Sequence, residues 1–342
     1  MPPVLKKIDF RPFDPFPFFK SGHTQTILSQ FFSSIPTIKN NIKNNINHYV
    51  TLSDKDTIFL AETPPKNSSN RIALLVHGLT GSQESSYMKR GAYYLSQAGY
   101  RVFRMNLRGC GPGLYHAKKL YHSGQSQDAQ EVLNWISKQY PFSPITLIGF
   151  SLGANLSLKL AGELGKKLHP VSSNLDSVIA VSPPLNLAAS VRLLSHKKNK
   201  FFNQYFLERL RQDMQKKRKL IANLPNLSRL KIKTLLDFDD QVTGPCNGFK
   251  NAQDYYQQCS SAPYIKSITL PTLILHAEDD PFIANADFYR LEKISNLDLL
   301  ITKSGGHLSW IGKTDQAFNF RWMDRVILKW INWLDAQNRK PF

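Results

Sequence analysis

Short apolar runs alternate along this chain with segments in which apolar residues recur every third or fourth position. The runs are typical of buried β-strands, and the longer spacing is typical of helices with one buried face. The predicted strands from residue 71 onward are 71–78, 100–107, 144–150, 177–182, 271–277 and 297–302. The helical spacing is clearest at Met88/Ala92/Leu95, Ala129/Val132/Leu133/Ile136 and Met323/Ile327/Trp330/Leu334. This alternation predicts an α/β fold whose mostly parallel central sheet is flanked by helices on both faces.

Three regions lie outside the alternation. Two β-like runs at 46–52 and 57–62 flank the turn-like sequence SDKD, which predicts a hairpin. Residues 1–45 are rich in Pro, Phe and Asn without a sustained period, which predicts an arm packed on the core. Residues 184–268 interrupt the strands and predict a helical cap insertion. The predicted core therefore comprises residues 46–183 and 269–342.

The sequence Gly149-Phe150-Ser151-Leu152-Gly153 joins a predicted strand directly to a predicted helix. The helix is indicated by leucines at every fourth position from Leu152 to Leu164. A GxSxG pattern alone also occurs in ordinary turns. Between a strand and a helix, however, it predicts a sharp turn that exposes the serine hydroxyl above the sheet. Ser151 is therefore the candidate nucleophile.

A serine hydroxyl needs a base and a residue that orients the base. His307 follows the strand at 297–302, and Asp279 and Asp280 follow the strand at 271–277, so the chain order is Ser, Asp, His. Taken alone, His307 could be a loop histidine, and the aspartates could cap a helix opened by Pro281. Together the three positions predict a triad of Ser151, Asp280 and His307. Asp279 and, more distantly, Asp128 are the alternative acids, although Asp128 fits a helix cap or a solvated position better.

An oxyanion hole requires backbone N–H groups near the serine. The sequence His77-Gly78-Leu79 follows a predicted strand, so the N–H groups of Leu79 and Leu152 are the candidates. His77 and Gly78 could also simply end the strand, which is compatible with this role. Cys110 and His23 have no ligand spacing or partner base, and we assign them packing or anchoring roles.

The chain carries 44 Lys and Arg against 25 Asp and Glu, a net charge of +19. Lys, Asn and Ile are abundant together, as in residues 38–47, which favours a general composition bias. The alternative is a surface that attracts phosphates or anionic membranes. Between Arg192 and Lys219 ten basic residues stand against two acidic ones, a run that could face anionic lipid. No nucleic-acid-binding motif accompanies the charge, so no nucleic-acid partner is expected.

Three cysteines without CxxC spacing predict neither a disulfide framework nor a structural zinc site. No metal or organic cofactor is expected. No apolar run approaches the roughly 18 residues of a membrane span, and the first 19 residues lack the apolar region of a signal peptide. These features predict a cytoplasmic protein, with peripheral contact at the inner face of the membrane as an option.

The stretches SGHTQTILS (21–29), HGLTGSQESSYM (77–88), NLRGCGPG (106–113) and GFSLGAN (149–155) resemble the α/β-hydrolase superfamily. They are similar to one branch, which holds bacterial YheT-type hydrolases, plant embryogenesis-associated proteins, yeast medium-chain ethyl ester synthases and animal abhydrolase-domain lipases. GHTQT is the most discriminating piece, since generic members of the superfamily lack it.

The resemblance implies a serine carboxylesterase for short-chain to medium-chain acyl esters, with monoacylglycerol-like lipids as possible substrates. An alcohol acyltransferase with the same triad is the alternative, and a catalytically silent basic binding protein is a more distant one. The insertion at 184–268 would cover the pocket and shape its acyl site. Its stripe of Phe202, Phe206, Leu210 and Met214 fits either a core against the sheet or a substrate surface, and the core is favoured.

Overall fold

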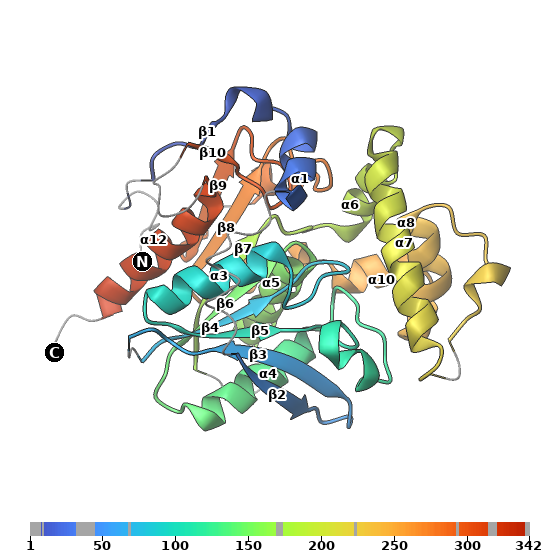
Figure 1. Cartoon of the computed structure of the whole chain (residues 1–342), viewed down its shortest axis with the longest axis horizontal. Coiled ribbons are helices and arrows are strands. Elements are labelled where there is room, and N and C mark those ends of the chain that lie inside the picture. The colour runs from blue at the N-terminus through green and yellow to red at the C-terminus, as the bar shows by residue number, and fades with distance from the viewer. Residues whose placement is uncertain are drawn as a thin grey trace.

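An eight-stranded sheet with the order β2-β3-β5-β4-β6-β7-β8-β9 forms the centre of the computed structural model (Figure 1). The structure describes residues 8, 10–31, 45–67, 70–168, 174–221, 224–291, 294–313 and 320–338. The strands are β2 (Ile46–Thr51), β3 (Thr57–Thr63), β4 (Ile72–Val76), β5 (Arg101–Met105), β6 (Ile145–Phe150), β7 (Leu175–Val181), β8 (Thr272–Ala277) and β9 (Leu297–Thr302). The α/β fold class predicted from the sequence is confirmed.

Within this sheet β3 alone runs opposite to the other strands. β2 and β3 form the predicted antiparallel hairpin, and β3 also pairs antiparallel with β5. From β5 to β9 every pair is parallel. Because parallel strands share one carboxyl edge, the loops after β4, β6, β8 and β9 meet on the same side of the sheet.

Helices cover both faces of the sheet, as the apolar spacing predicts. On one face α3 (Ser86–Gln97) and α12 (Trp322–Asn338) share a core whose members include Met88, Met323 and Trp330. On the other face α4 (Ser126–Gln139) and α5 (Leu152–Gly165) contribute to a second core. The central strands β4 and β6 are buried on both sides and are accordingly mostly apolar rather than alternating, with Thr146 as a polar exception.

The described part of the predicted arm contains a helix. It comprises β1 (Asp14–Pro15), the 3-10 turn η2 (Pro17–Phe19) and α1 (Gly22–Phe31). β1 pairs with the short strand β10 (Gly312–Lys313), so the arm lies against the chain that follows β9. Residues 1–7, 9 and 32–44 of the arm lie outside the described residues.

Helices, all but one of eight residues or fewer, make up most of the segment from Leu187 to Ser267. They are α6 (Leu187–Leu194), η4 (Lys197–Asn199), α7 (Lys200–Lys217), η5 (Leu227–Arg229), α8 (Leu235–Phe238), the π-helical η6 (Asp239–Thr243), α9 (Gly244–Cys246), α10 (Ala252–Cys259) and η7 (Ala262–Ser267). Figure 1 shows α6, α7, α8 and α10 beside one end of the sheet. η7 instead packs on α5, where a Cβ on Gly162 would lie 2.3 Å from the carbonyl oxygen of Tyr264. We call α6 to α10 the cap.

A short helix, α11 (Ala286–Tyr289), lies between β8 and β9. Among the described residues, no helix has both the length and the apolar character needed to cross a membrane.

Candidate active site

Ser151 stands at the turn between β6 and α5 in a conformation that non-glycine residues rarely adopt, with φ 54° and ψ −118°. The two glycines of the motif make this turn possible. A Cβ on Gly149 would lie 2.3 Å from the carbonyl oxygen of Gly153, and one on Gly153 would lie 2.4 Å from that of Val76. Any larger residue would push the strand and the helix apart. A strained backbone at such a turn holds the serine side chain above the sheet.

The structure brings the three residues of the predicted triad together. Nε2 of His307 lies 2.9 Å from Oγ of Ser151, and Nδ1 of His307 lies 2.8 Å from Oδ2 of Asp280. The other carboxylate oxygen of Asp280 accepts hydrogen bonds from the backbone N–H groups of Phe282 and Ile283. Burial opposes the charge of Asp280, but the neighbouring imidazole and these N–H groups more than offset it, and its pKa lies below the usual value.

The two alternative acids point elsewhere. Oδ1 of Asp279 accepts the N–H of Gly306 at 2.8 Å, so this side chain braces the loop that holds His307. Asp128 is buried and bonds through both oxygens to Arg108, at 2.7 and 2.8 Å. It is therefore part of a buried ion pair, and the expectation of a capping or solvated Asp128 was wrong.

The loop after β4 lies against the serine. A Cβ on Gly78 would come within 3.0 Å of Cβ of Ser151, so glycine is needed for the approach. Two tyrosines hold this loop: Tyr87 accepts the N–H of Gly78 at 3.0 Å, and Tyr121 accepts that of Thr80 at 3.1 Å. Between them, Leu79 lines the same cavity as Ser151. Neither the N–H of Leu79 nor that of Leu152 has an acceptor in the described part of the chain.

His77 supports this loop from below, a role that the sequence did not reveal. It is fully buried, its Nε2 accepts the N–H of Leu107 at 3.0 Å, and its Nδ1 donates to the carbonyl oxygen of Gly78 at 2.7 Å. Burial lowers the pKa of His77 to about 4, so the ring is neutral and its tautomer is fixed by the two hydrogen bonds. It therefore fixes the carbonyl that precedes the N–H of Leu79.

The GHTQT sequence binds the loop that carries His307. Oγ1 of Thr26 accepts the N–H of His307 at 2.9 Å. The side chain of Gln25 bonds to both the N–H and the carbonyl oxygen of Ile311, each at 2.8 Å, and the backbone carbonyl oxygen of Gln25 accepts the hydroxyl of Ser309. Gly22 lies so close to the backbone of Asp279 that a Cβ there would clash at 1.7 Å. The arm thus fixes the loop that carries His307 through hydrogen bonds and close backbone contact.

His23 and Cys110 do not belong to the hydrogen-bonded series of Ser151, His307 and Asp280. His23 bonds to Asn199 at 2.9 Å, and Asn199 in turn donates to the carbonyl oxygen of Pro281. His23 thus links the arm to the start of α7. Cys110 is buried, which raises the pKa of its thiol to about 12. Such a thiol is unreactive.

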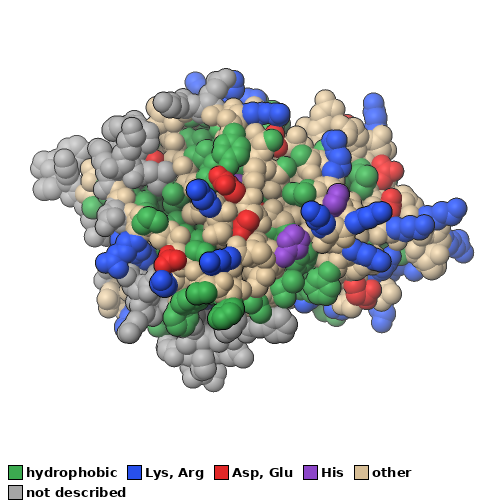
Figure 2. All heavy atoms as spheres, turned by 90° about the horizontal axis from the view of Figure 1, so that it is seen from above, with side chains coloured by type: hydrophobic (Ala, Val, Ile, Leu, Met, Phe, Trp, Pro, Cys, Tyr) green, Lys and Arg blue, Asp and Glu red, His purple; other side chains and the backbone are tan. Residues whose placement is uncertain are grey.

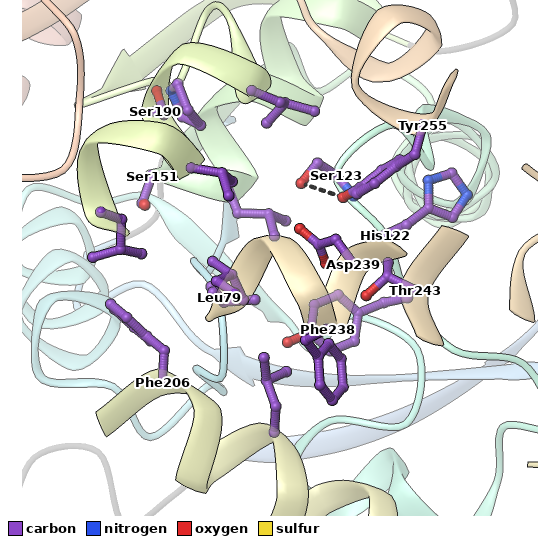
Figure 3. A pocket seen from close by; sticks show the side chains of 18 of the residues that line it. Leu79, His122, Ser123, Ser151, Ser190, Phe206, Phe238, Asp239, Thr243 and Tyr255 are labelled. Atoms are coloured by element: carbon purple, nitrogen blue, oxygen red, sulfur yellow. Dashed lines mark hydrogen bonds between the residues drawn. The ribbon is translucent and has the colours of Figure 1, made fainter. Parts of the chain in front are cut away.

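Two hollows meet at Ser151 and His307. The first, here called the cap cavity, lies between the core and the cap (Figure 3). Its walls are mainly apolar and include Leu79, Leu120, Leu152, Leu187, Val191, Leu194, Phe206, Leu210, Met214, Leu235, Phe238, Phe282 and Ile283. Phe206, Leu210 and Met214 belong to the stripe for which a core against the sheet was favoured. They line the cavity and also pack into the main apolar core, whereas Phe202 of the same stripe is in that core and lines the second hollow described below.

Polar side chains lie across the cap cavity from Ser151. Figure 3 shows Ser123, His122, Asp239, Thr243 and Tyr255 grouped on that side, with the hydroxyl of Tyr255 bonded to Ser123 at 2.9 Å. Burial raises the pKa of Asp239 to about 6, although Asp239 accepts a hydrogen bond from the hydroxyl of Tyr256. Burial lowers the pKa of His122 to about 4, so this ring is neutral.

The second hollow, here called the outer cleft, is wider and more polar. It is formed by α1, by the loop after β4 and by the first half of α7. Its lining includes Thr26, Ser29, Ser82, Ser85, Lys89, Phe201, Tyr205 and Arg209. Ser151 therefore opens to an apolar cavity on one side and to a polar cleft on the other. A group bonded to its hydroxyl could extend into the cavity while a second, leaving group departs through the cleft.

The comparisons with known proteins agree with this architecture. Residues 74–314 match the model of the alpha/beta hydrolase fold. YheT of Escherichia coli (strain K12) is 31% identical, with 95% of each chain covered. The monoacylglycerol lipase of Saccharomyces cerevisiae is 26% identical, with 81% of this chain and 61% of the yeast protein covered.

A human relative and a solved structure are also similar to this chain. Human phospholipase ABHD3 is 26% identical, with 85% of this chain and 71% of the human one covered. The Pyrococcus furiosus esterase Pf2001 has the same fold, with a TM-score of 0.58 and 19% identity over 86% of this chain and 93% of that one. With one family model over most of its length and a full-length relative above 30% identity, the chain belongs to the α/β-hydrolase family.

Proposed function

We propose that this protein is a serine hydrolase that cleaves carboxylic esters of short-chain to medium-chain acyl groups through an acyl-enzyme. The observation that carries the proposal is the hydrogen-bonded chain from Ser151 through His307 to Asp280. A base within 2.9 Å of a strained, partly exposed serine, itself held by a buried carboxylate, is the arrangement that activates a hydroxyl.

In the first half of the reaction, Oγ of Ser151 attacks the carbonyl carbon of the ester. His307 takes the hydroxyl proton on Nε2, and Asp280 stabilises the imidazolium through Nδ1. The N–H groups of Leu79 and Leu152 bind the oxyanion that develops on the carbonyl oxygen. His307 then gives the proton to the departing alcohol, which leaves an acyl group on Ser151.

In the second half, water enters and attacks the acyl-enzyme. His307 accepts a proton from the water, and the resulting tetrahedral intermediate uses the same two N–H groups. Collapse of this intermediate returns the proton to Ser151 and releases the carboxylic acid. Every group in the cycle comes from the protein, the ester or water.

The two hollows support an assignment of the two parts of the substrate. The cap cavity fits the acyl chain, because its walls are mainly Leu, Val, Ile, Met and Phe. The outer cleft fits the alcohol part, because hydroxyl and charged side chains line it. Relatives named as a monoacylglycerol lipase and a phospholipase support lipid esters as the substrate class.

Alcohol acyl transfer is the second candidate, and the outer cleft favours it specifically. A cleft that releases one alcohol can admit another, which would attack the acyl-enzyme in place of water. A relative named as a medium-chain fatty acid ethyl ester synthase/esterase supports both outcomes.

The basic run on the cap supports contact with an anionic membrane. Arg192, Lys197, Lys198 and Lys200 are exposed, and Phe201 beside them is 67% exposed. Figure 2 shows Lys and Arg side chains gathered over the end of the molecule that holds the cap. Cosedimentation with vesicles containing anionic lipid, but not with neutral vesicles, is the expected result. Equal binding to both would leave this surface as an ordinary solvated face.

Chromogenic esters test the proposal. Purified protein should hydrolyse p-nitrophenyl esters from acetate to decanoate, and the Ser151→Ala variant should not. Added ethanol or glycerol should divert part of the acyl group to a new ester if transfer competes with hydrolysis. A wild-type protein that hydrolyses none of these esters, or a Ser151→Ala variant as active as the wild type, would favour a catalytically silent basic protein.

A further inference from the structure

Lys217, the last residue of α7, departs from the rest of the basic run. Its side chain is only 2% exposed, whereas the neighbouring Lys216 and Arg218 are exposed. It lines the cap cavity, the same hollow that contains Ser151 and His307. One cation of the predicted lipid-facing run therefore points inward instead.

The core makes room for this ammonium group. A Cβ on Gly109 would lie 2.7 Å from both Cε and Nζ of Lys217, so the amine rests directly on the backbone at that residue. Gly109 adopts a φ of 62° within the NLRGCGPG sequence. On the other side, Nζ lies 5.5 Å from the ring centroid of Tyr121, the residue whose hydroxyl holds the N–H of Thr80. The position of Lys217 is thus built by the core and lies next to the loop of Leu79.

The Lys217 ammonium group makes no hydrogen bond or ion pair to any part of the chain that the structure describes. Burying a cation that has no hydrogen bond to an anion is costly, and a ring at 5.5 Å offsets only part of that cost. Asp213, one turn earlier on α7, also lines the cavity; burial raises its pKa, and the positive charge of Lys217 opposes that rise. Asp213 therefore attracts the ammonium group through space without a hydrogen bond to it. Asp239 is already engaged by the hydroxyl of Tyr256 at 2.8 Å.

From this geometry we infer that Lys217 binds an anionic oxygen group, a carboxylate or a phosphate, on the part of the substrate that enters the cap cavity. The inference rests on the proposed function and narrows its substrate class. Apolar walls hold the middle of the acyl chain, and the ammonium group pairs with a charged end. Such a charge-assisted bond in an apolar cavity is stronger than one to a neutral acceptor.

Four p-nitrophenyl esters with the same six-carbon acyl chain test the inference. They are the hexanoate, the 6-hydroxyhexanoate, the mono-adipate and the 6-phosphonooxyhexanoate, measured with wild type, Lys217→Met and Lys216→Met. Lys217→Met should lower kcat/KM for one or both anionic esters on the order of 10-fold to 100-fold relative to the hexanoate, mainly through KM. The anionic ester with the larger loss identifies the preferred group. Lys216→Met removes an equal charge outside the cavity and should leave the ratios unchanged.

Three results would overturn the inference. One is an unchanged ratio of anionic to neutral ester in Lys217→Met. Another is an equal loss for all four esters, which would indicate a structural role or a general effect on the oxyanion. The third is a greater loss for the hydroxyl ester than for the anionic ones.

Binding to an inactive variant separates this inference from the proposed function. Calorimetry of monomethyl adipate with Ser151→Ala, with and without Lys217→Met, needs no turnover. If the wild type hydrolyses none of the esters, the proposed function fails. The calorimetric comparison still decides whether Lys217 binds the anion.

Discussion

Two regions meet at Ser151 and differ in how they hold their side chains. At the rim of the sheet, the reactive groups are fixed by hydrogen bonds and strained turns: Asp280 by two backbone N–H groups, and His307 by Thr26 and Asp280. On the cap, most of the side chains that face the cavity are apolar and are held by packing, with Tyr255, Tyr256 and Asp239 as hydrogen-bonded exceptions. Under the proposed function, this difference assigns the reaction to the rim and the choice of ester to the cap.

The largest loss is expected at the centre of the rim. Ser151→Ala and His307→Ala should each lower kcat on the order of a million-fold, because either change removes the activated hydroxyl. Hydrolysis of p-nitrophenyl butyrate measures the effect. Combining the two changes should add little, since both residues act as one unit. Fully additive losses would contradict the shared role.

Asp280→Asn should cost about 10⁴-fold in kcat, because an amide no longer stabilises the imidazolium and favours the wrong tautomer of His307. Asp279→Asn is the matched control at the neighbouring position. Its side-chain oxygen can still accept the N–H of Gly306, so kcat should change by only a few fold. The opposite ranking would move the acid of the triad to Asp279.

The arm tests whether the hydrogen bonds around the rim matter for the reaction. Gln25→Ala or Thr26→Val should lower kcat about 10-fold to 100-fold with little change in KM, because the loop of His307 loses its clamp. Thr24→Val is the control, since Thr24 bonds to Ser21 within the arm. Unchanged kcat in both test variants, with a lowered melting temperature, would reduce the arm to a stabilising element.

The cap should show the smallest effect and a different kind of effect. Leu210→Trp fills part of the cap cavity, so kcat/KM for the decanoate should fall by about 10-fold while the acetate is almost unaffected. Leu236→Trp, at a 40% exposed position of α8, is the control. An equal loss for both esters would show that the cap contributes to the reaction itself.

The sequence predicts which residues meet at the rim, but it does not predict which side chains of the helical cap face the cavity. Strands such as Ile72–Val76 are buried on both faces and hold only apolar residues, so the run is visible without any neighbour. The Ser, Asp and His order depends only on where strands end. On the cap, the role of Phe206 and Lys217 depends on the distance between α7 and the sheet, which no local pattern records.

The arm shows a similar limit. Gly22–Phe31 is helical although the spacing of its apolar residues is weak. The hydrogen bonds of Gln25 to Ile311, 286 residues away, help to hold this helix in place. His77 likewise reads as the end of a strand, and only its bond to Leu107 reveals its place beneath the loop of Leu79. Contacts between distant segments, rather than local periodicity, decide both roles.

Labelling with a fluorophosphonate probe, followed by peptide mass spectrometry, tests directly whether His307 activates the hydroxyl of Ser151. We expect one covalent adduct on Ser151 of the wild type, strongly slowed labelling in His307→Ala and none in Ser151→Ala. A properly folded wild-type protein that stays unlabelled, or one that carries the adduct on another residue, would contradict this expectation.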